Sequence, residues 1–239
     1  MLPEIAPPNS NRIPDGTFPL LRKDKLNLQK RLESFRNTDH LGGVNELACW
    51  ALLQHEGHKG KPVPTTSAAS PDFQLDPPAD CFVESLTLNL SEEEKQAFAA
   101  NKSVALNHTK TIQRFFGKLT GQKQKQLKHA ADNGKPGVLA VFDYTEWSGY
   151  GTEFFRALAD ALLGQQFAFQ HVAPELSAIL YLERRVIDGR IVLSRNRSAI
   201  YLNPLARHPL PTAMFPSLTE FSLQVATVQA QSSEPWLSL

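Results

Sequence analysis

The sequence has little of several features that would place it in a functional class at once. It carries only two cysteines in 239 residues, Cys49 and Cys81, and both lie in apolar surroundings. We expect both to be reduced core thiols in a cytoplasmic protein rather than disulfide partners in a secreted one. The formal net charge is only +1, so any contact with nucleic acid must come from a local basic patch.

Long apolar runs are also missing. None approaches the roughly 18 residues that a membrane-spanning helix needs. The first residues, MLPEIAPPNSNRIPDG, have neither the basic start nor the apolar stretch of a secretory leader. We therefore expect no membrane partner.

Several familiar catalytic motifs do not occur. There is no G-x-S-x-G nucleophile elbow, and SGYGT at 148–152 is too short for a phosphate-binding loop and lacks its lysine. HEGHK contains His55 and His58, but it does not have the H-E-x-x-H spacing of a zinc peptidase. An unrelated α/β enzyme with a histidine metal site is therefore only a third interpretation, behind the two developed below.

What is present is the composition of an ordinary globular domain, with 41% hydrophobic and 21% charged residues. Residues 1–19 predict an extended N-terminal arm, 20–215 a single domain, and 216–239 a C-terminal extension with a weak helix near 217–227. Helical patterns fall at 23–37, 39–57, 91–103, 109–131 and 152–166, and strand patterns at 71–75, 81–88, 137–144, 176–185 and 186–203. The order predicts an α/β fold with a mixed central sheet flanked by helices.

Three acidic residues stand in apolar contexts. Glu46 lies on the same helix face as Cys49 and Trp50, so its carboxylate either pairs, binds a metal, or escapes to solvent near the helix end. Asp72 opens the first of two predicted strands, although Pro-Asp is also a common turn. Glu84 sits in the middle of the second strand, CFVESLTL, neither of whose faces is cleanly polar. Carboxylates on adjacent strands can converge on one Mg²⁺ ion.

A lysine interrupts the apolar stripe of the helix predicted over 109–131. On a helical wheel Lys123 falls about 20° from Ile112, and Gln126 lies beside it. Lys123 either extends its amine to solvent at the end of the stripe or neutralises a buried acid. Other lysines of this segment lie on the opposite, basic face.

Together these segments resemble the restriction endonuclease-like nucleases, the PD-(D/E)XK superfamily. The matching pieces are GGVNELACWALL with Glu46, PDF with Asp72, FVESL with Glu84, and the basic helix and apolar strand GKLTGQKQKQLKHAADNGKPGVLAVFDY. The similarity covers residues 39–145. It implies a restriction endonuclease-like core, a Mg²⁺ (or Mn²⁺) site at Asp72 and Glu84, and hydrolysis of phosphodiester bonds in nucleic acid, DNA in preference to RNA.

The chain departs from that family at one position. The family's lysine should follow two residues after Glu84, where this sequence has Leu86. One hypothesis is that Lys123 replaces it, Glu46 assists, and Gln126 orients a water or a phosphate. The alternative is a catalytically degenerate member that acts as a nucleic-acid-binding or protein-interaction module, and a homodimer is compatible with both.

A cluster of five arginines is a further candidate for phosphate contacts, or simply the solvated rim of a hairpin. It comprises Arg184, Arg185, Arg190, Arg195 and Arg197.

Overall fold

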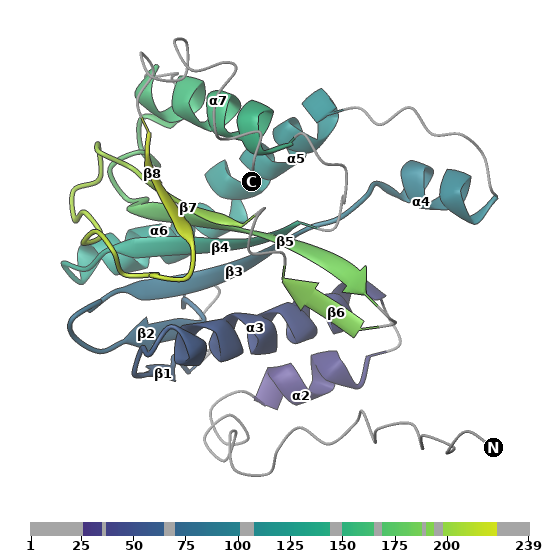
Figure 1. Ribbon diagram of the computed structural model, residues 1–239, viewed down its shortest axis with the longest axis horizontal. Coiled ribbons are helices and arrows are strands. Elements are labelled where there is room, and N and C mark those ends of the chain that lie inside the picture. Colours follow the sequence, from purple (N-terminus) through teal and green to yellow (C-terminus); the bar gives the residue numbers. More distant parts are fainter. Residues whose placement is uncertain are drawn as a thin grey trace, which may run out of the picture.

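The computed structural model describes residues 26–34, 37–64, 70–100, 108–143, 150–164, 169–187, 190–193 and 198–223 (Figure 1). The N-terminal arm predicted for residues 1–19 lies outside these ranges. The described helices are α2 (Leu26–Leu32), α3 (Asn37–His55), α4 (Glu92–Ala99), α5 (His108–Thr120), α6 (Gln122–Asp132) and α7 (Tyr150–Leu163). The described strands are β1 (Gly60–Pro62), β2 (Phe73–Leu75), β3 (Phe82–Leu88), β4 (Gly137–Asp143), β5 (Ala178–Ile187), β6 (Arg190–Leu193), β7 (Ala199–Leu202) and β8 (Thr219–Ser222).

The strands form one mixed sheet in the order β1-β2-β3-β4-β5-β7-β8, and β6 pairs with the far end of β5. The first three strands are antiparallel neighbours, whereas β3, β4 and β5 run parallel. β4 is buried along its whole length, as expected for a central strand that is covered on both faces. The prediction of an α/β fold with a mixed sheet flanked by helices is confirmed.

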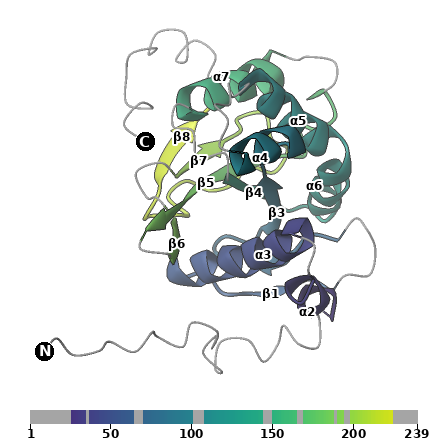
Figure 2. The same ribbon diagram turned by 90° about the vertical axis from the view of Figure 1, so that its right-hand side faces the viewer.

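Helices cover the sheet in two layers (Figures 1 and 2). α3 packs on one face, where Cys49, Leu53 and Val83 belong to one apolar core. α2 packs against the outer side of α3, so α3 is sandwiched, as its apolar surface predicts. The other face carries α5, α6 and α7, whose core includes Leu86 of β3 and Leu127 of α6. Alternate residues of β3 therefore point to opposite helical layers.

The helix predicted as one unit over 109–131 is two helices, and that prediction is wrong. α5 ends at Thr120, and α6 starts at Gln122 after Gly121, whose backbone angles (φ −102°, ψ −99°) are not helical. A Cβ at position 121 would lie 2.9 Å from the carbonyl oxygen of Gly117. Glycine therefore permits the sharp change of direction.

Two smaller features near the ends of the domain also differ from expectation. The weak helix predicted near 217–227 is wrong, because Thr219–Ser222 forms β8 and extends the sheet beyond residue 215. β1 was not predicted, since three residues carry too little pattern to mark a strand.

The segment YLNPLARHPLP begins with the last two residues of β7 and is held by a buried asparagine. The amide of Asn203 donates to the carbonyls of Ala173 and Leu176 at 2.7 Å each, and its oxygen accepts from the N–H of Leu205 at 3.0 Å. Asn203 therefore anchors this segment to the turn before β5, which is a structural role.

Candidate active site

Asp72 lies directly before β2, at the end of the β2–β3 pair that is away from their connecting turn. Its N–H donates to the carbonyl oxygen of Val83 at 3.1 Å, although Val83 is already the register partner of Phe73. Two successive residues thus face one residue across the pair, as at a β-bulge. The carboxylate of Asp72 accepts from the N–H of Ser85 at 2.9 Å and from its hydroxyl at 2.5 Å.

β3 continues beyond its pairing with β2, and this exposes one edge of the strand. The N–H of Phe82 donates to Pro136, just before β4, so the backbone groups of odd-numbered residues of β3 point the other way, toward β2. Past Val83 those groups have no strand partner among the described residues. Instead the carboxylate of Asp72 binds the N–H of Ser85, and the amine of Lys118 donates to the carbonyl of Thr87 at 2.8 Å. We call the backbone of residues 85–87 the open edge of β3.

Glu84 lies directly before the open edge and is only 5% exposed. It shares the face of Leu86 and Leu88, which points toward α6. There Lys123 forms an ion pair with its carboxylate. Of the two interpretations of Lys123, the structure shows the neutralised buried acid and not a lysine extended to solvent.

Gln126 follows Lys123 by one helical turn and is buried on the same side of α6 as Leu127 and Ala130. The helical wheel drawn for 109–131 predicts Lys123 and Gln126 on the inner face, and this holds although the segment is two helices and not one. The spacing of three and four residues within α6 is enough to orient both side chains, whatever the phase of α5.

Glu46 comes from the opposite helical layer and is almost fully buried. Its carboxylate pairs with the guanidinium of Arg31 on α2, with a distance of 2.7 Å between Oε2 and Nη1. Pairing with an arginine was one of the alternatives for Glu46. The partner could not be named from the sequence, because α2 and α3 are separate helices whose packing is tertiary.

Each of the three acids acts on the thiol of Cys49. Burial raises the pKa of Cys49 well above its ordinary value, and the negative charges of Asp72, Glu46 and Glu84 raise it further. Nevertheless, in the described part of the chain no three His, Cys, Asp or Glu side chains are grouped to hold a metal ion. The partners of Asp72 and Glu84 also lie on different sides of β3, since Ser85 points to the α3 layer. A metal bound jointly by these two carboxylates stays a prediction.

The arginine cluster falls largely outside what can be described. Arg184, Arg185 and Arg190 lie on β5 and β6, but their side chains are outside the described part, and Arg195 and Arg197 lie outside the described residues. Its role in binding phosphate stays a prediction.

A second buried polar group was missed from the sequence. Asp143, the last residue of β4, and Glu183, in the middle of β5, are register partners, and the hydroxyl of Tyr181 donates to Asp143 at 2.5 Å. Burial raises the pKa of Tyr181, and the charge of Asp143 and the hydrogen bond to it raise it further. The available signal was the acid that ends the apolar run GVLAVFD.

Comparison with models of protein families, with curated proteins and with solved structures finds no match for this chain. No helix within the described ranges is long and apolar enough to cross a membrane.

Proposed function

We propose that this chain is a divergent metal-dependent nuclease with a restriction endonuclease-like core, which hydrolyses phosphodiester bonds in DNA. The observation that carries the proposal is the buried ion pair of Glu84 and Lys123, placed where β2 leaves β3 and next in sequence to Ser85, which Asp72 binds. A preference for DNA over RNA, a homodimer and a cytoplasmic location are predictions that accompany it.

The order of elements supports the proposal. The residues of the resemblance fall, in sequence, on α3 (Glu46), at the start of β2 (Asp72), on β3 (Glu84), on α6 (Lys123) and on the parallel neighbour β4. The resemblance implies the same order, an antiparallel pair followed by a helical crossover to a parallel strand.

The energetics of the ion pair also favour a chemical role. Burying two opposite charges costs several kcal/mol of hydration per ion, and apolar replacements of such pairs are often neutral or stabilising. Lys123 and Glu84 are only 12% and 7% exposed in their side chains, so they carry that cost. A lysine and a carboxylate beside the open edge of β3 are groups that phosphodiester hydrolysis uses, the lysine to stabilise developing negative charge and the carboxylate to bind a metal ion.

Asp72 and Glu84 would hold the metal, Mg²⁺ or Mn²⁺. Two carboxylates on adjacent strands suit Mg²⁺, which binds through one or two carboxylates and leaves its other positions to water and substrate phosphates. When bound there, the ion would polarise the phosphodiester and lower the pKa of a coordinated water.

Lys123 and Gln126 would act on the substrate directly. The ammonium of Lys123 has three donors, so it can bond Glu84 and a phosphate oxygen together and stabilise negative charge that develops on the phosphate. The amide of Gln126, one turn further along α6, would orient a water or a phosphate oxygen. Glu46, held by Arg31, would add negative charge at a distance and assist only by electrostatics.

A specific observation supports the second candidate, a degenerate module that binds without cutting. Leu86, which stands at the usual lysine position, is 4% exposed and belongs to the core against α5 and α6. In addition, the carboxylate of Asp72 accepts a hydrogen bond from the backbone N–H of Ser85 in the open edge. This structural role would explain Asp72 without a metal ion. The two candidates differ in whether DNA that is bound is also cleaved.

The test is cleavage of plasmid DNA and of a labelled duplex in Mg²⁺ or Mn²⁺, with EDTA as the blank. Asp72→Asn and Glu84→Gln should abolish metal-dependent cleavage, and Lys123→Gln should lower its rate about 10²–10³-fold. Asp132→Asn is the matched control, because Asp132 is an exposed carboxylate of α6 that pairs only locally with Lys128. It should cleave at the wild-type rate.

Two outcomes would overturn the nuclease. If wild type and Glu84→Gln cleave equally, the activity does not belong to this site. If wild type binds DNA but does not cut it with either metal, the degenerate module is the better description. Circular dichroism of each variant shows whether a loss of cleavage reflects a loss of fold.

A further inference from the structure

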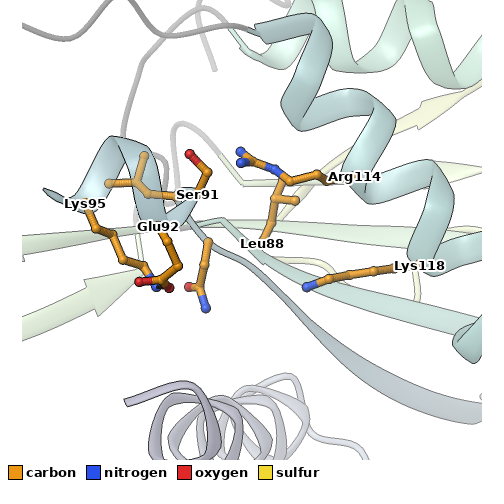
Figure 3. A pocket seen from close by; sticks show the side chains of 8 residues that line it. Leu88, Ser91, Glu92, Lys95, Arg114 and Lys118 are labelled. Atoms are coloured by element: carbon orange, nitrogen blue, oxygen red, sulfur yellow. Dashed lines mark hydrogen bonds and ion pairs between the residues drawn. The ribbon is translucent and has the colours of Figure 1, made fainter. Parts of the chain in front are cut away.

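A cavity of about 260 Å³ opens where β3 ends. It is lined by the last residue of β3, the start of α4 and one side of α5, namely Leu88, Asn89, Leu90, Ser91, Glu92, Lys95, Arg114 and Lys118. In Figure 3, Arg114 and Lys118 reach from α5 toward the start of α4, where Ser91 and Lys95 lie, and the cavity lies between them.

Positive charge predominates in this cavity, because three of its lining residues are cationic and one is acidic. Lys95 pairs with Glu92 at 2.7 Å, and Arg114 contacts Glu94 at the longer distance of 3.3 Å. Lys118 forms no ion pair with any carboxylate of the described residues, and its amine donates only to the neutral carbonyl of Thr87. The cavity therefore presents one uncompensated cation.

The surroundings of Lys118 oppose its charge. Lys118 is an exposed residue of α5, but its amine folds back onto the carbonyl of Thr87 near the end of β3 and is partly removed from solvent there. Burial of the amine lowers the pKa of Lys118, and the positive charges of Lys123 and Arg114 lower it further. The Nε of Arg114 is buried and has no hydrogen-bond acceptor in the described part of the chain. An anion in the cavity would offset the repulsion between these cations.

The cavity continues the proposed active site along one line. The open edge of β3 begins at Ser85, which holds Asp72, and reaches Thr87, which holds Lys118. Two residues of a strand span about 7 Å. A polyanion that lies along this edge would meet Glu84 and Lys123 first and the cavity next.

We propose that the cavity between β3, α4 and α5 binds a phosphate group of the same DNA strand whose adjacent phosphodiester lies at Glu84 and Lys123. This inference rests on the proposed function. Lys118 supplies the charge of the contact, and Arg114 and Lys95 supply further donors. Lys118 would then be a binding residue and not a catalytic one.

The test is DNA binding in EDTA, so that cleavage plays no part. The anisotropy of a fluorescein-labelled duplex is measured at several salt concentrations for wild type, Lys118→Gln and the control Lys125→Gln. Lys125 is exposed on α6, outside the cavity. Lys118→Gln should weaken binding several-fold and reduce the slope of log K against log[salt] by about 0.9, the loss of one phosphate contact. Lys125→Gln should leave the slope unchanged.

Competition with inorganic phosphate distinguishes a site for a DNA phosphate from a site for free phosphate. At matched ionic strength, inorganic phosphate should displace the duplex from wild type and have a smaller effect on Lys118→Gln. Equal slopes for Lys118→Gln and wild type, or equal losses in both lysine variants, would overturn the cavity as a phosphate site. If phosphate binds through Lys118 but the duplex does not bind at all, the DNA ligand is wrong.

Failure here is distinct from failure of the nuclease. A protein that loses cleavage in Glu84→Gln but keeps its salt slope in Lys118→Gln would remain a nuclease without this contact.

Discussion

At the scale of single residues, Glu84 and Lys123 place opposite charges in an interior where neither could stay alone. Each ion loses several kcal/mol of hydration on burial, and the mutual attraction offsets this only while both are present. The other two acids have different partners: Asp72 accepts a hydrogen bond from Ser85, and Glu46 forms an ion pair with Arg31. The site therefore contains three acids, each fixed by its own partner.

Removing only the cation of the buried pair should destabilise the fold. In Lys123→Met, Glu84 is left without its buried counter-charge, and the free energy of unfolding should fall by about 3–5 kcal/mol. The double variant Glu84→Gln with Lys123→Met should recover most of this loss, because no isolated charge is left behind. Urea unfolding at pH 7 measures both differences.

The same double variant separates stability from function. It should remain unable to cleave DNA although its stability is restored. Additive losses in the double variant would show that the two residues do not interact in the interior.

At the scale of elements, α4 is short and depends on its first turn. Ser91 and Glu94 form a reciprocal capping box, with Ser91 N–H donating to Glu94 at 2.6 Å and Glu94 N–H donating to Ser91 Oγ at 3.1 Å. This confirms the cap that the sequence pattern S-E-E-E predicts. Arg114 of α5 joins the cap through Glu94 and so positions α4 as a wall of the cavity.

Loss of this cap should have a stability effect that depends on pH. Burial alone would raise the pKa of Glu94, but hydrogen bonds from Ser91 and the charge of Arg114 lower it below its ordinary value of 4.5. The ionised cap thus stabilises the fold above pH 4.5, and this contribution is lost as the pH falls through the lower folded pKa. Ser91→Ala should cost about 1 kcal/mol of unfolding free energy at pH 7.

The difference between wild type and Ser91→Ala should shrink when urea unfolding is repeated below pH 4. Glu92→Gln serves as the comparison, because its exposed pair with Lys95 contributes less than about 1 kcal/mol. A Ser91→Ala effect of constant size across this pH range would show that the cap acts only through Ser91 Oγ and the N–H of Glu94, without a contribution from the charge of Glu94.

At the scale of the whole molecule, the parallel strands β3, β4 and β5 form the covered centre of the sheet. β4 has strand partners on both sides and apolar cores on both faces, whereas β1 has one strand partner. The candidate site lies at the boundary between these regions, where β2 leaves β3. A site at such a boundary has a rigid support on one side and an accessible edge on the other.

Hydrogen exchange should reproduce this gradient of stability. Amides of Val138–Phe142 in β4 should exchange most slowly, close to the rate set by global unfolding, and those of β1 and β2 should exchange faster through local opening. Mass spectrometry of peptides from exchanged protein measures the difference. Equal protection of β2 and β4 would place the candidate site inside the most stable unit instead of at its edge.

Local patterns were sufficient to predict much of this molecule. GVLAVF is an apolar run and forms all of β4 except its last residue. The helix predicted to end at Gly57 ends at His55, and Gly57 has the positive φ of 84° that glycine favours after a helix. Lys123 and Gln126 were assigned to an inner helix face by spacing alone, because three and four residues complete one turn. These features depend on neighbours within a few positions of the chain.

Other features depended on contacts between distant segments. The break at Gly121 and the strand at 219–222 have weak local signals, and Arg31 and Ser85 were not predicted as partners of Glu46 and Asp72. The local sequence was sufficient to single out three acids and one lysine as candidate site residues, because each stands among apolar neighbours within a few positions of the chain. Only the packed chain decided which acid faces which helix, because that depends on the bulge at Asp72 and on where β2 stops pairing with β3.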